Sequence, residues 1–213
     1  MKYRFAKILF LFLLNSAVFA QSTPTFKSGV AYLSRFIASD YFLQLKNSSG
    51  HPDLTDTLYL RSLNFYKGDY SEALLALTFA CLPYKVMPLS IPVISVKVNI
   101  PLPAVADPLF SIKTRNLPSK LFEDSPNSEF GDKDKLSHFF GNAFIEYNFP
   151  FFNLSKFLGI FVEKFEETFY VQGAMDKRDL IINRLGAQFG KALCNDKNVR
   201  PSQFFKKYSG YTK

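Results

Sequence analysis

The sequence has 213 residues, a formal net charge of +8, and 25 Phe and 11 Tyr but no Trp. This length suffices for one sizeable core or two small ones, and a surplus of Phe beyond the core would be available to face lipid or a hydrophobic ligand. The sequence contains no H-E-x-x-H or G-x-S-x-G motif, no cysteine cluster and no glycine-rich phosphate loop, which excludes the best-known signatures of zinc hydrolases, serine hydrolases and nucleotide-binding proteins.

The first twenty residues have the pattern of an export signal. Three basic residues, at positions 2, 4 and 7, precede a short apolar run and a small-residue cleavage site that ends at Ala20. The apolar run is shorter than the roughly 20 residues that span a bilayer. No Cys follows the cleavage point to carry a lipid anchor. We therefore expect an exported protein, periplasmic or associated with the cell envelope, that starts at Gln21 after removal of residues 1–20.

The charge of this mature chain would fall from +8 to +5, because the signal takes three basic residues with it. The excess is diffuse apart from a basic tail over residues 195–213, which includes Arg200, Lys206 and Lys207. In an exported protein such a charge favours contact with a membrane surface or another anionic envelope component over nucleic acid. A basic surface that merely keeps the protein soluble is the alternative.

Residues 21–92 are predicted to be a helical region. Apolar residues recur at helical spacing over 27–46, before Asn and Ser residues and Gly50 break the pattern. Asp53 can begin a second helix that runs to Tyr66. After a Gly-Asp turn, a third helix opens at Ser71 and reaches Cys81.

The second and third of these helices resemble one tetratricopeptide repeat. The resemblance rests on the turn, the small crossing residues and the proline after the second helix, which are Gly68, Asp69, Tyr70, Ala73, Ala80 and Pro83. Arg61 stands where the repeat has a small residue. Such arrays usually need about three copies and one is visible, so a helical hairpin with similar turn chemistry is the alternative.

Residues 93–130 are predicted to be a strand followed by an extended connector. The run from Val93 to Ile100 is rich in β-branched residues, with Lys97 and Asn99 alternating among them. Residues 104–130 are rich in Pro, Ser and Asn and have no periodicity, so we expect an extended linker there.

Residues 131–194 are predicted to form a three-helix unit. Its helices are expected over about 132–147, 153–170 and 176–193, and charged residues recur in each one, which argues against membrane spans. The expected fold class is therefore mainly α, with helical hairpins, a C-terminal three-helix unit and a short strand and extended connector between them.

Polar residues in this unit occur in pairs four positions apart, a spacing that stacks both members on one face of a helix. The pairs could line a single polar pocket. They are Asp134 with His138, Glu163 with Glu167, and Asp179 with Asn183.

These residues also resemble the VanZ-like and YfiM-like families of envelope proteins. A D-K-x-x-H-F opening is present at Asp134, Lys135, His138 and Phe139, and an acidic residue precedes a D-x-x-x-N-x-x-G-x-x-x-G helix at Glu163, Asp179, Asn183, Gly186 and Gly190. The match covers about sixty residues. Glu166 replaces a Gln that is usual in VanZ-like proteins, which are polytopic, so the exported YfiM-like form fits better. The resemblance implies a site and a location but no reaction.

The candidate catalytic residues are His138, Glu163 and Asp179, which can act as acids, bases or metal ligands. Asp179 has a simpler alternative as the N-cap of its helix. The candidate binding residues are Asp134, Lys135 and Asn183. Lys135 either balances the charge of the pocket or is a solvated neighbour of Asp134.

Asn183 needs hydrogen-bond partners if it faces inward, and Glu163 and His138 are the natural candidates. Gly186 and Gly190 are predicted to be structural, because small residues one turn apart allow a second helix to approach closely. Cys81 and Cys194 either form a disulfide or remain free, with Cys81 a buried thiol.

The function expected from these features is non-catalytic binding or a structural role in the cell envelope. One alternative is an envelope hydrolase or transferase, or a metal-binding protein, that uses His138, Glu163 and Asp179. Another is a peripheral membrane protein that uses surplus Phe and the basic tail. The sequence does not indicate a cofactor, the identity of a metal, a substrate or an oligomeric state.

Overall fold

The structure, a computed structural model, describes residues 24–48, 51–91, 96–150 and 177–209. The predicted export signal and the predicted middle helix of the C-terminal unit, with Glu163, Glu166 and Glu167, lie outside these residues.

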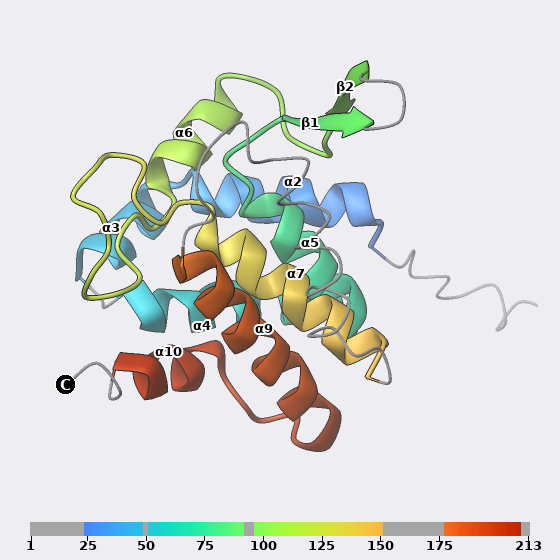
Figure 1. The fold of residues 1–213 in the computed structure, drawn as a ribbon, viewed down its shortest axis with the longest axis vertical. Helices are drawn as coiled ribbons and strands as arrows, with labels where there is room; N and C mark the ends of the chain where they lie inside the picture. The colour runs from blue at the N-terminus through green and yellow to red at the C-terminus, as the bar shows by residue number, and fades with distance from the viewer. Residues whose placement is uncertain (1–23, 49–50, 92–95, 151–176, 210–213) are drawn as a thin grey trace, which may run out of the picture.

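The fold is mainly α, as predicted, with one small two-stranded sheet. The elements in chain order are α2 (Phe26–Ile37), α3 (Asp40–Ser48), α4 (His51–Phe65), α5 (Tyr70–Ala80), β1 (Val86–Ile91), β2 (Val96–Pro101), α6 (Leu109–Asn116), α7 (Lys135–Asn148), α9 (Lys177–Asn195) and α10 (Pro201–Ser209). Helix α7 lies at the centre between α5 and α9, while α2 covers α5, and α4 contacts both α5 and α10 (Figure 1). Among the described helices, none is both long enough and apolar enough to cross a membrane.

The single helix expected over residues 27–46 is wrong, because the structure has two, α2 and α3. Ser39 separates them through its hydroxyl group, which donates to the carbonyl of Phe36 at 2.7 Å and accepts from the backbone N–H of Phe42 at 3.2 Å. A serine that serves the backbone in this way competes with a continuous helical ladder. The second helix therefore starts in a new direction.

Helices α4 and α5 form the hairpin that the sequence predicts. Asp69 caps α5 by accepting a hydrogen bond from the N–H of Glu72 at 3.0 Å. Gly68 has a φ of 89°, a left-handed conformation that glycine adopts at little cost, and its N–H donates to the carbonyl of Leu63. The hydroxyl of Ser62 then ties α4 to the carbonyl of Ala73 at 2.9 Å, so both capping and packing fix this turn.

Three elements lie where the sequence predicted no regular structure. Strand β1 pairs with β2 in an antiparallel ladder, so the predicted strand is one half of a hairpin. Helix α6 interrupts the predicted connector, and α10 occupies much of the predicted basic tail. Helices α6 and α10 depend on contacts with distant segments, and β1 depends on its pairing with β2, which local periodicity does not reveal.

Helix α6 is held by polar side chains that cross to other helices. The side-chain amide of Asn116 donates to the carbonyl of Ile37 at 2.9 Å, at the end of α2. The ammonium group of Lys113, a residue that is only 1% exposed, donates to the carbonyl of Leu82 and lies 4.4 Å from the ring centroid of Phe110. These bonds satisfy buried carbonyls at the ends of α2 and α5.

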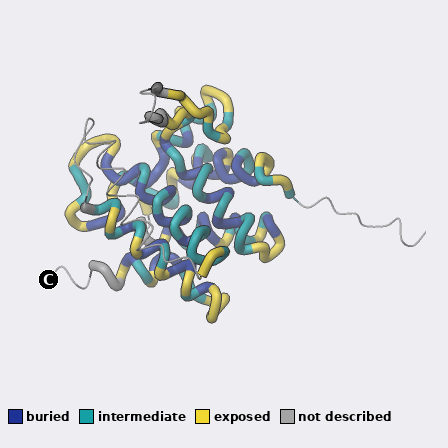
Figure 2. Tube along the Cα trace, turned by 45° about the vertical axis from the view of Figure 1, so that its right-hand side comes forward, coloured by how far each residue is buried: buried dark blue, intermediate teal, exposed yellow. Residues whose placement is uncertain are grey.

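Helix α10 is attached to α4 through carboxylates and to the core through aromatic rings. Asp56 accepts hydrogen bonds from the N–H of Ser202 at 2.8 Å and from its hydroxyl at 2.6 Å. The ring of Phe205 lies 4.9 Å from that of Phe139 on α7, and Phe139 stacks on Phe189 of α9 at 5.4 Å. The buried core therefore runs continuously from the first helical hairpin to the last helix (Figure 2).

Candidate functional site

Helices α7 and α9 lie side by side and parallel. The carbonyl of Phe139 on α7 faces Gly186 on α9, and one turn further along both helices the carbonyl of Ala143 faces Gly190. A Cβ atom added at Gly186 would lie 2.2 Å from the carbonyl oxygen of Phe139, and one at Gly190 would lie 2.3 Å from that of Ala143. The two glycines therefore permit a helix contact that no larger residue allows, and this contact brings both helix N-termini together.

The two N-termini carry carboxylates that meet on one lysine. Nζ of Lys135 lies 3.1 Å from Oδ1 of Asp134, at the N-cap of α7, and 2.7 Å from Oδ1 of Asp179, in the first turn of α9. The Lys135 side chain is only 4% exposed. Carboxylates are favoured at helix N-termini, where unpaired N–H groups create a positive field, and Lys135 offsets part of the negative charge of the two that converge here.

Two opposing effects act on the pKa of Lys135. Burial is the largest and lowers the pKa, because it disfavours the charged form. The hydrogen bonds to Asp179 and Asp134 and the negative charges of both carboxylates together outweigh it, so the pKa lies above the ordinary value of 10.5. Lys135 is therefore a permanent cation in this cluster.

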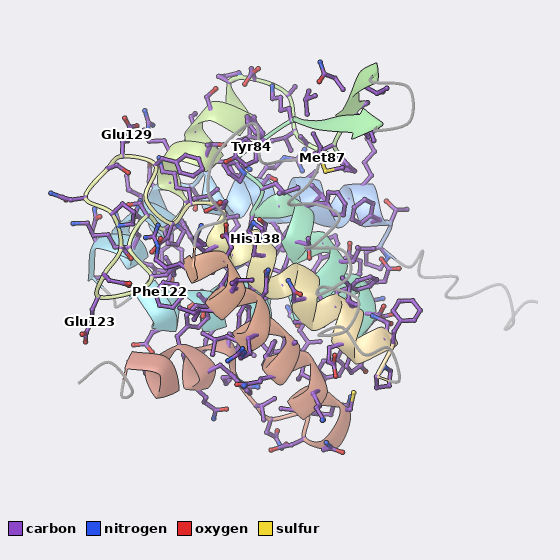
Figure 3. The ribbon with its side chains drawn as sticks, viewed as in Figure 1. Tyr84, Met87, Phe122, Glu123, Glu129 and His138 are labelled. Atoms are coloured by element: carbon purple, nitrogen blue, oxygen red, sulfur yellow. The ribbon has the colours of Figure 1, made fainter. Side chains whose placement is uncertain are left out.

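His138 lies at the exposed edge of the same cluster, one turn along α7 (Figure 3). Its Nε2 is 3.9 Å from Oδ1 of Asp179, which is beyond hydrogen-bond distance, and its side chain is 40% exposed. One ligand atom each from Asp134, His138 and Asp179 lie within 4.8 Å of one another, an arrangement that could hold a metal ion. The structure thus brings together four of the predicted site residues, with Lys135 among them.

Asn183 has a different partner from those expected. Its Oδ1 accepts a hydrogen bond of 2.8 Å from the amide of Asn142 on α7, and the same amide donates to the backbone carbonyl of His138 at 2.8 Å. The histidine side chain is not involved, and Glu163 lies outside the described residues. Asn142 was missed in the sequence, although it stands four residues after His138, as Asn183 does after Asp179.

Tyr84 is a second residue that the sequence did not single out. It follows α5 and is 47% exposed, and its ring lies 6.0 Å from that of Phe130. Burial of the hydroxyl raises the pKa of Tyr84, and the negative charge of Asp134 adds to this effect, while Lys135 opposes it and Asp179 reinforces it. The phenol therefore lies within electrostatic reach of the cluster (Figure 3).

A second ion pair links α9 to the segment before α7, and its residues lie shortly before Lys135 and Asp179 in the sequence. Asp132, whose side chain is fully buried, accepts from Nη1 of Arg178 at 3.0 Å and from the N–H of Leu121 at 3.0 Å, and Ser125 donates to it as well. Asp132 was considered only as a helix start. Its observed role is to fasten the loop before α7 to the first turn of α9.

Ser137, the serine next to His138 in the described part of the chain, is not available as a nucleophile. Ser137 is buried, and its hydroxyl donates to the backbone carbonyl of Asp134 at 2.6 Å. Asp179 contacts Lys135, so it does not orient the imidazole by a hydrogen bond. The nucleophile, base and orienting acid of a hydrolytic triad are therefore not assembled from these three residues.

Cys81 and Cys194 are both free thiols, so the disulfide alternative is not realised. Cys81 is buried at the end of α5, and burial raises its pKa to about 12. Cys194 is exposed near the end of α9, with Sγ 3.6 Å from the carbonyl of Gly190.

Comparison with known proteins gives one result for all three kinds of search. The chain matches no family model, no curated protein and no solved structure. The resemblance to VanZ-like and YfiM-like proteins stays a prediction that rests on the spaced residues of α7 and α9.

Proposed function

We propose that this chain is an exported, non-catalytic protein of the cell envelope, related to the YfiM-like proteins, and that Asp134, Lys135 and Asp179 form a structural ion-pair lock. In this proposal the lock holds α7 and α9 in register, and the exposed surface beside it, which includes Tyr84, is available for binding an envelope component. The proposal rests on the predicted export signal and on the spaced polar residues of the sequence.

The observation that carries this proposal is the position of Lys135. Its ammonium group lies against both carboxylates while the side chain is almost completely buried, so the acidic groups are engaged with an internal cation. A general acid or base needs a free proton site near the substrate. A buried pair held from two helices is instead costly to break, because loss of one partner leaves an uncompensated charge.

Stability measurements on three variants test the lock. Lys135→Met leaves two carboxylates close together without their cation and should lower the free energy of unfolding by about 3–5 kcal/mol. The double variant Lys135→Met with Asp179→Asn removes one of these charges and should recover part of the loss. His138→Ala, at a site that is 40% exposed, should change it by less than about 0.5 kcal/mol.

Complementation of a deletion strain separates the lock from a working catalytic site. His138→Ala should support the same envelope phenotype as the wild-type chain, because a non-catalytic protein does not need its imidazole for proton transfer. A folded His138→Ala protein that fails to complement, together with an unchanged stability of Lys135→Met, would overturn the proposal.

A divalent cation site is the second candidate, favoured by the close approach of Asp134, His138 and Asp179. Carboxylate oxygens and an imidazole nitrogen are suitable ligands for zinc or manganese. Since Lys135 already contacts both carboxylates, a cation would have to displace its ammonium group.

Calorimetric titration with Zn²⁺ and Mn²⁺ tests this second candidate. If the three residues are ligands, Lys135→Met should bind the ion more tightly than the wild-type chain, and adding His138→Ala to that variant should remove the gain. Equal or absent binding in both chains would rule the metal site out.

A further inference from the structure

The β1–β2 hairpin exposes a group of apolar side chains at one end of the molecule. Four of its residues are more than a third exposed, namely Val86 at 45%, Met87 at 46%, Val98 at 40% and Ile100 at 36%. The hairpin stands apart from the helices, next to the turn that leads into α6 (Figure 1). Single exposed apolar residues are normal on a protein surface, but several together mark a contact surface.

The pairing of the strands brings apolar residue types together along the ribbon. Every second pair in the register joins two apolar residues, and these pairs are Met87 with Ile100, Leu89 with Val98, and Ile91 with Val96. Alternate pairs of a two-stranded ribbon belong to the same face. The hairpin therefore has the pattern of a sheet face that is covered by something apolar.

The hairpin and the segment that follows it contain very few ionisable residues. Residues 86–106 contain a single ionisable residue, Lys97, and no carboxylate, within a chain of net charge +8. Asp107, the next acidic residue, is paired with Lys85 at the base of the hairpin. An apolar element with a positive and no negative charge is attracted to anionic lipid, and no acidic group has to be brought to that surface.

Aromatic side chains lie close to the base of the hairpin. Tyr84, two residues before β1, is 47% exposed, and Phe130, whose ring is next to it, is 42% exposed. Aromatic rings are favoured at the boundary between lipid and water.

We infer that the β1–β2 hairpin inserts its exposed Val, Met and Ile side chains into the interfacial layer of an anionic phospholipid bilayer, with Tyr84 and Phe130 at the boundary. This surface differs from the one expected from the sequence. The Phe residues in the described part of the chain are buried or half-buried apart from Phe130 and Phe149, and α10 packs Phe205 into the core. The inference goes beyond the proposed ion-pair lock and does not depend on it.

Two other occupants fit the hairpin less well. In a symmetric dimer the same surface would meet itself, which would bring together two hairpins that each carry one positive and no negative charge. A protein partner commonly binds through aromatic and Arg anchors, whereas the described exposed side chains of the strands are Val, Met and Ile, with Asn99 and Pro101.

The absence of Trp from the chain allows a direct test with the full-length protein. Val98→Trp places a unique fluorophore on the hairpin, and Leu60→Trp places one at a similarly exposed position on α4, where Leu60 is 41% exposed. Each variant is mixed with vesicles of phosphatidylcholine alone or with phosphatidylglycerol added. A brominated lipid is included as a quencher. Each fluorophore reports its own position, whatever other part of the chain touches the vesicle.

We expect a blue shift and quenching for Val98→Trp with the anionic vesicles, a weaker response with the neutral ones, and little response for Leu60→Trp. Adding Ile100→Asp to Val98→Trp should weaken the response about tenfold, because an apolar side chain that would insert into the lipid is replaced by a charge. Adding Leu60→Asp instead should leave it unchanged. Melting curves of all variants should coincide.

Three results would overturn the inference. The first is an unchanged Val98→Trp spectrum on anionic vesicles, which would leave a protein partner as the occupant. The second is equal quenching at positions 98 and 60, which would mean that the hairpin is not the contact. The third is a blue shift that appears without vesicles as the protein concentration rises, which would show that a second copy covers the hairpin.

Discussion

Asp132 and Arg178, which are 46 residues apart in the chain, meet across the N-terminal ends of α7 and α9, with Nη1 of Arg178 3.0 Å from Oδ1 of Asp132. The carboxylate is fully buried and the guanidinium-bearing side chain is 15% exposed. Together with the neighbouring contact between Lys135 and Asp179, this pair defines how the two parallel helices start.

Asp132→Ala should therefore lower the free energy of unfolding by about 3–5 kcal/mol, since it removes a partner of Arg178 and leaves the N–H of Leu121 without its acceptor. Urea denaturation followed by circular dichroism measures the loss. Asp107→Asn is the matched control, because it breaks an ion pair with Lys85 at an exposed site and should leave the midpoint unchanged. Equal effects of the two substitutions would contradict the structural role of Asp132.

The glycines of α9 give a second prediction. Gly186→Ala places a Cβ atom 2.2 Å from a backbone oxygen of α7, so the two helices must separate. We expect a loss of about 2 kcal/mol or more in thermal unfolding, despite the higher helix propensity of Ala. Gly141→Ala on α7 is the control, because its Cβ would lie 3.3 Å from a methyl group of Thr78 and needs only a small adjustment. A stabilised Gly186→Ala protein would be incompatible with the close contact.

A third prediction concerns pH. Burial lowers the pKa of Lys113 from 10.5 to about 8, which the charge of a Cys81 thiolate would oppose. Between these values the unfolded chain binds more protons than the folded chain, so stability rises with pH as the folded lysine loses its charge. Above pH 9 the rise is offset, because burial raises the pKa of Cys81 from 9.0 to about 12, and above pH 10 the trend reverses, because burial also raises the pKa of Tyr66 from 10.0 to about 12.

The free energy of unfolding should consequently increase by about 1 kcal/mol between pH 8 and pH 9, and Lys113→Met should remove most of this increase. Lys46 contributes in the same direction, since burial and the charge of Lys133 lower its pKa, and this contribution remains in the variant. Denaturant titrations at half-unit pH intervals measure both slopes. A Lys113→Met slope identical to that of the wild-type chain would mean that Lys113 is already neutral or solvated.

The two cysteines should react at very different rates with a disulfide reagent. Cys194 is exposed, whereas Cys81 is buried and its raised pKa leaves almost no thiolate at neutral pH. The native chain should release about one equivalent of chromophore quickly, and the Cys194→Ser variant almost none. Unfolding in guanidinium should expose the remaining thiol in each protein. No reaction in the unfolded wild-type chain would indicate an oxidised pair.

The sequence predicts the helices whose ends are determined locally. Asp69 caps α5 and Gly68 turns the chain, so the α4–α5 hairpin lies close to its expected position. The polar face of α7 and α9 was also predictable, because residues four apart share one face of a helix. This spacing relates Asp134 to His138, and the close contact of α7 with α9 at Gly186 and Gly190 brings Asp179 to them and to Lys135.

What the sequence did not predict depends on long-range partners. Helix α6 relies on Asn116 reaching the end of α2, and Asn183 on an amide of the neighbouring helix. Tyr84 approaches the cluster from a segment about fifty residues earlier. The spacing of polar and apolar residues carries no information about such long-range contacts. A single sequence gives the residue types without their partners.

The attachment of α10 to α4 has a consequence for how the protein is made. Asp56 obtains its partner from Ser202, 146 residues later, and the ring of Phe205 completes a cluster that includes Phe139. The first helical hairpin can collapse before α10 is available, but its outer surface stays uncovered until residues 202–205 reach it. A chain that stalls or is cut before residue 202 would retain most of its helices and still expose a hydrophobic gap, which quality-control proteases can recognise.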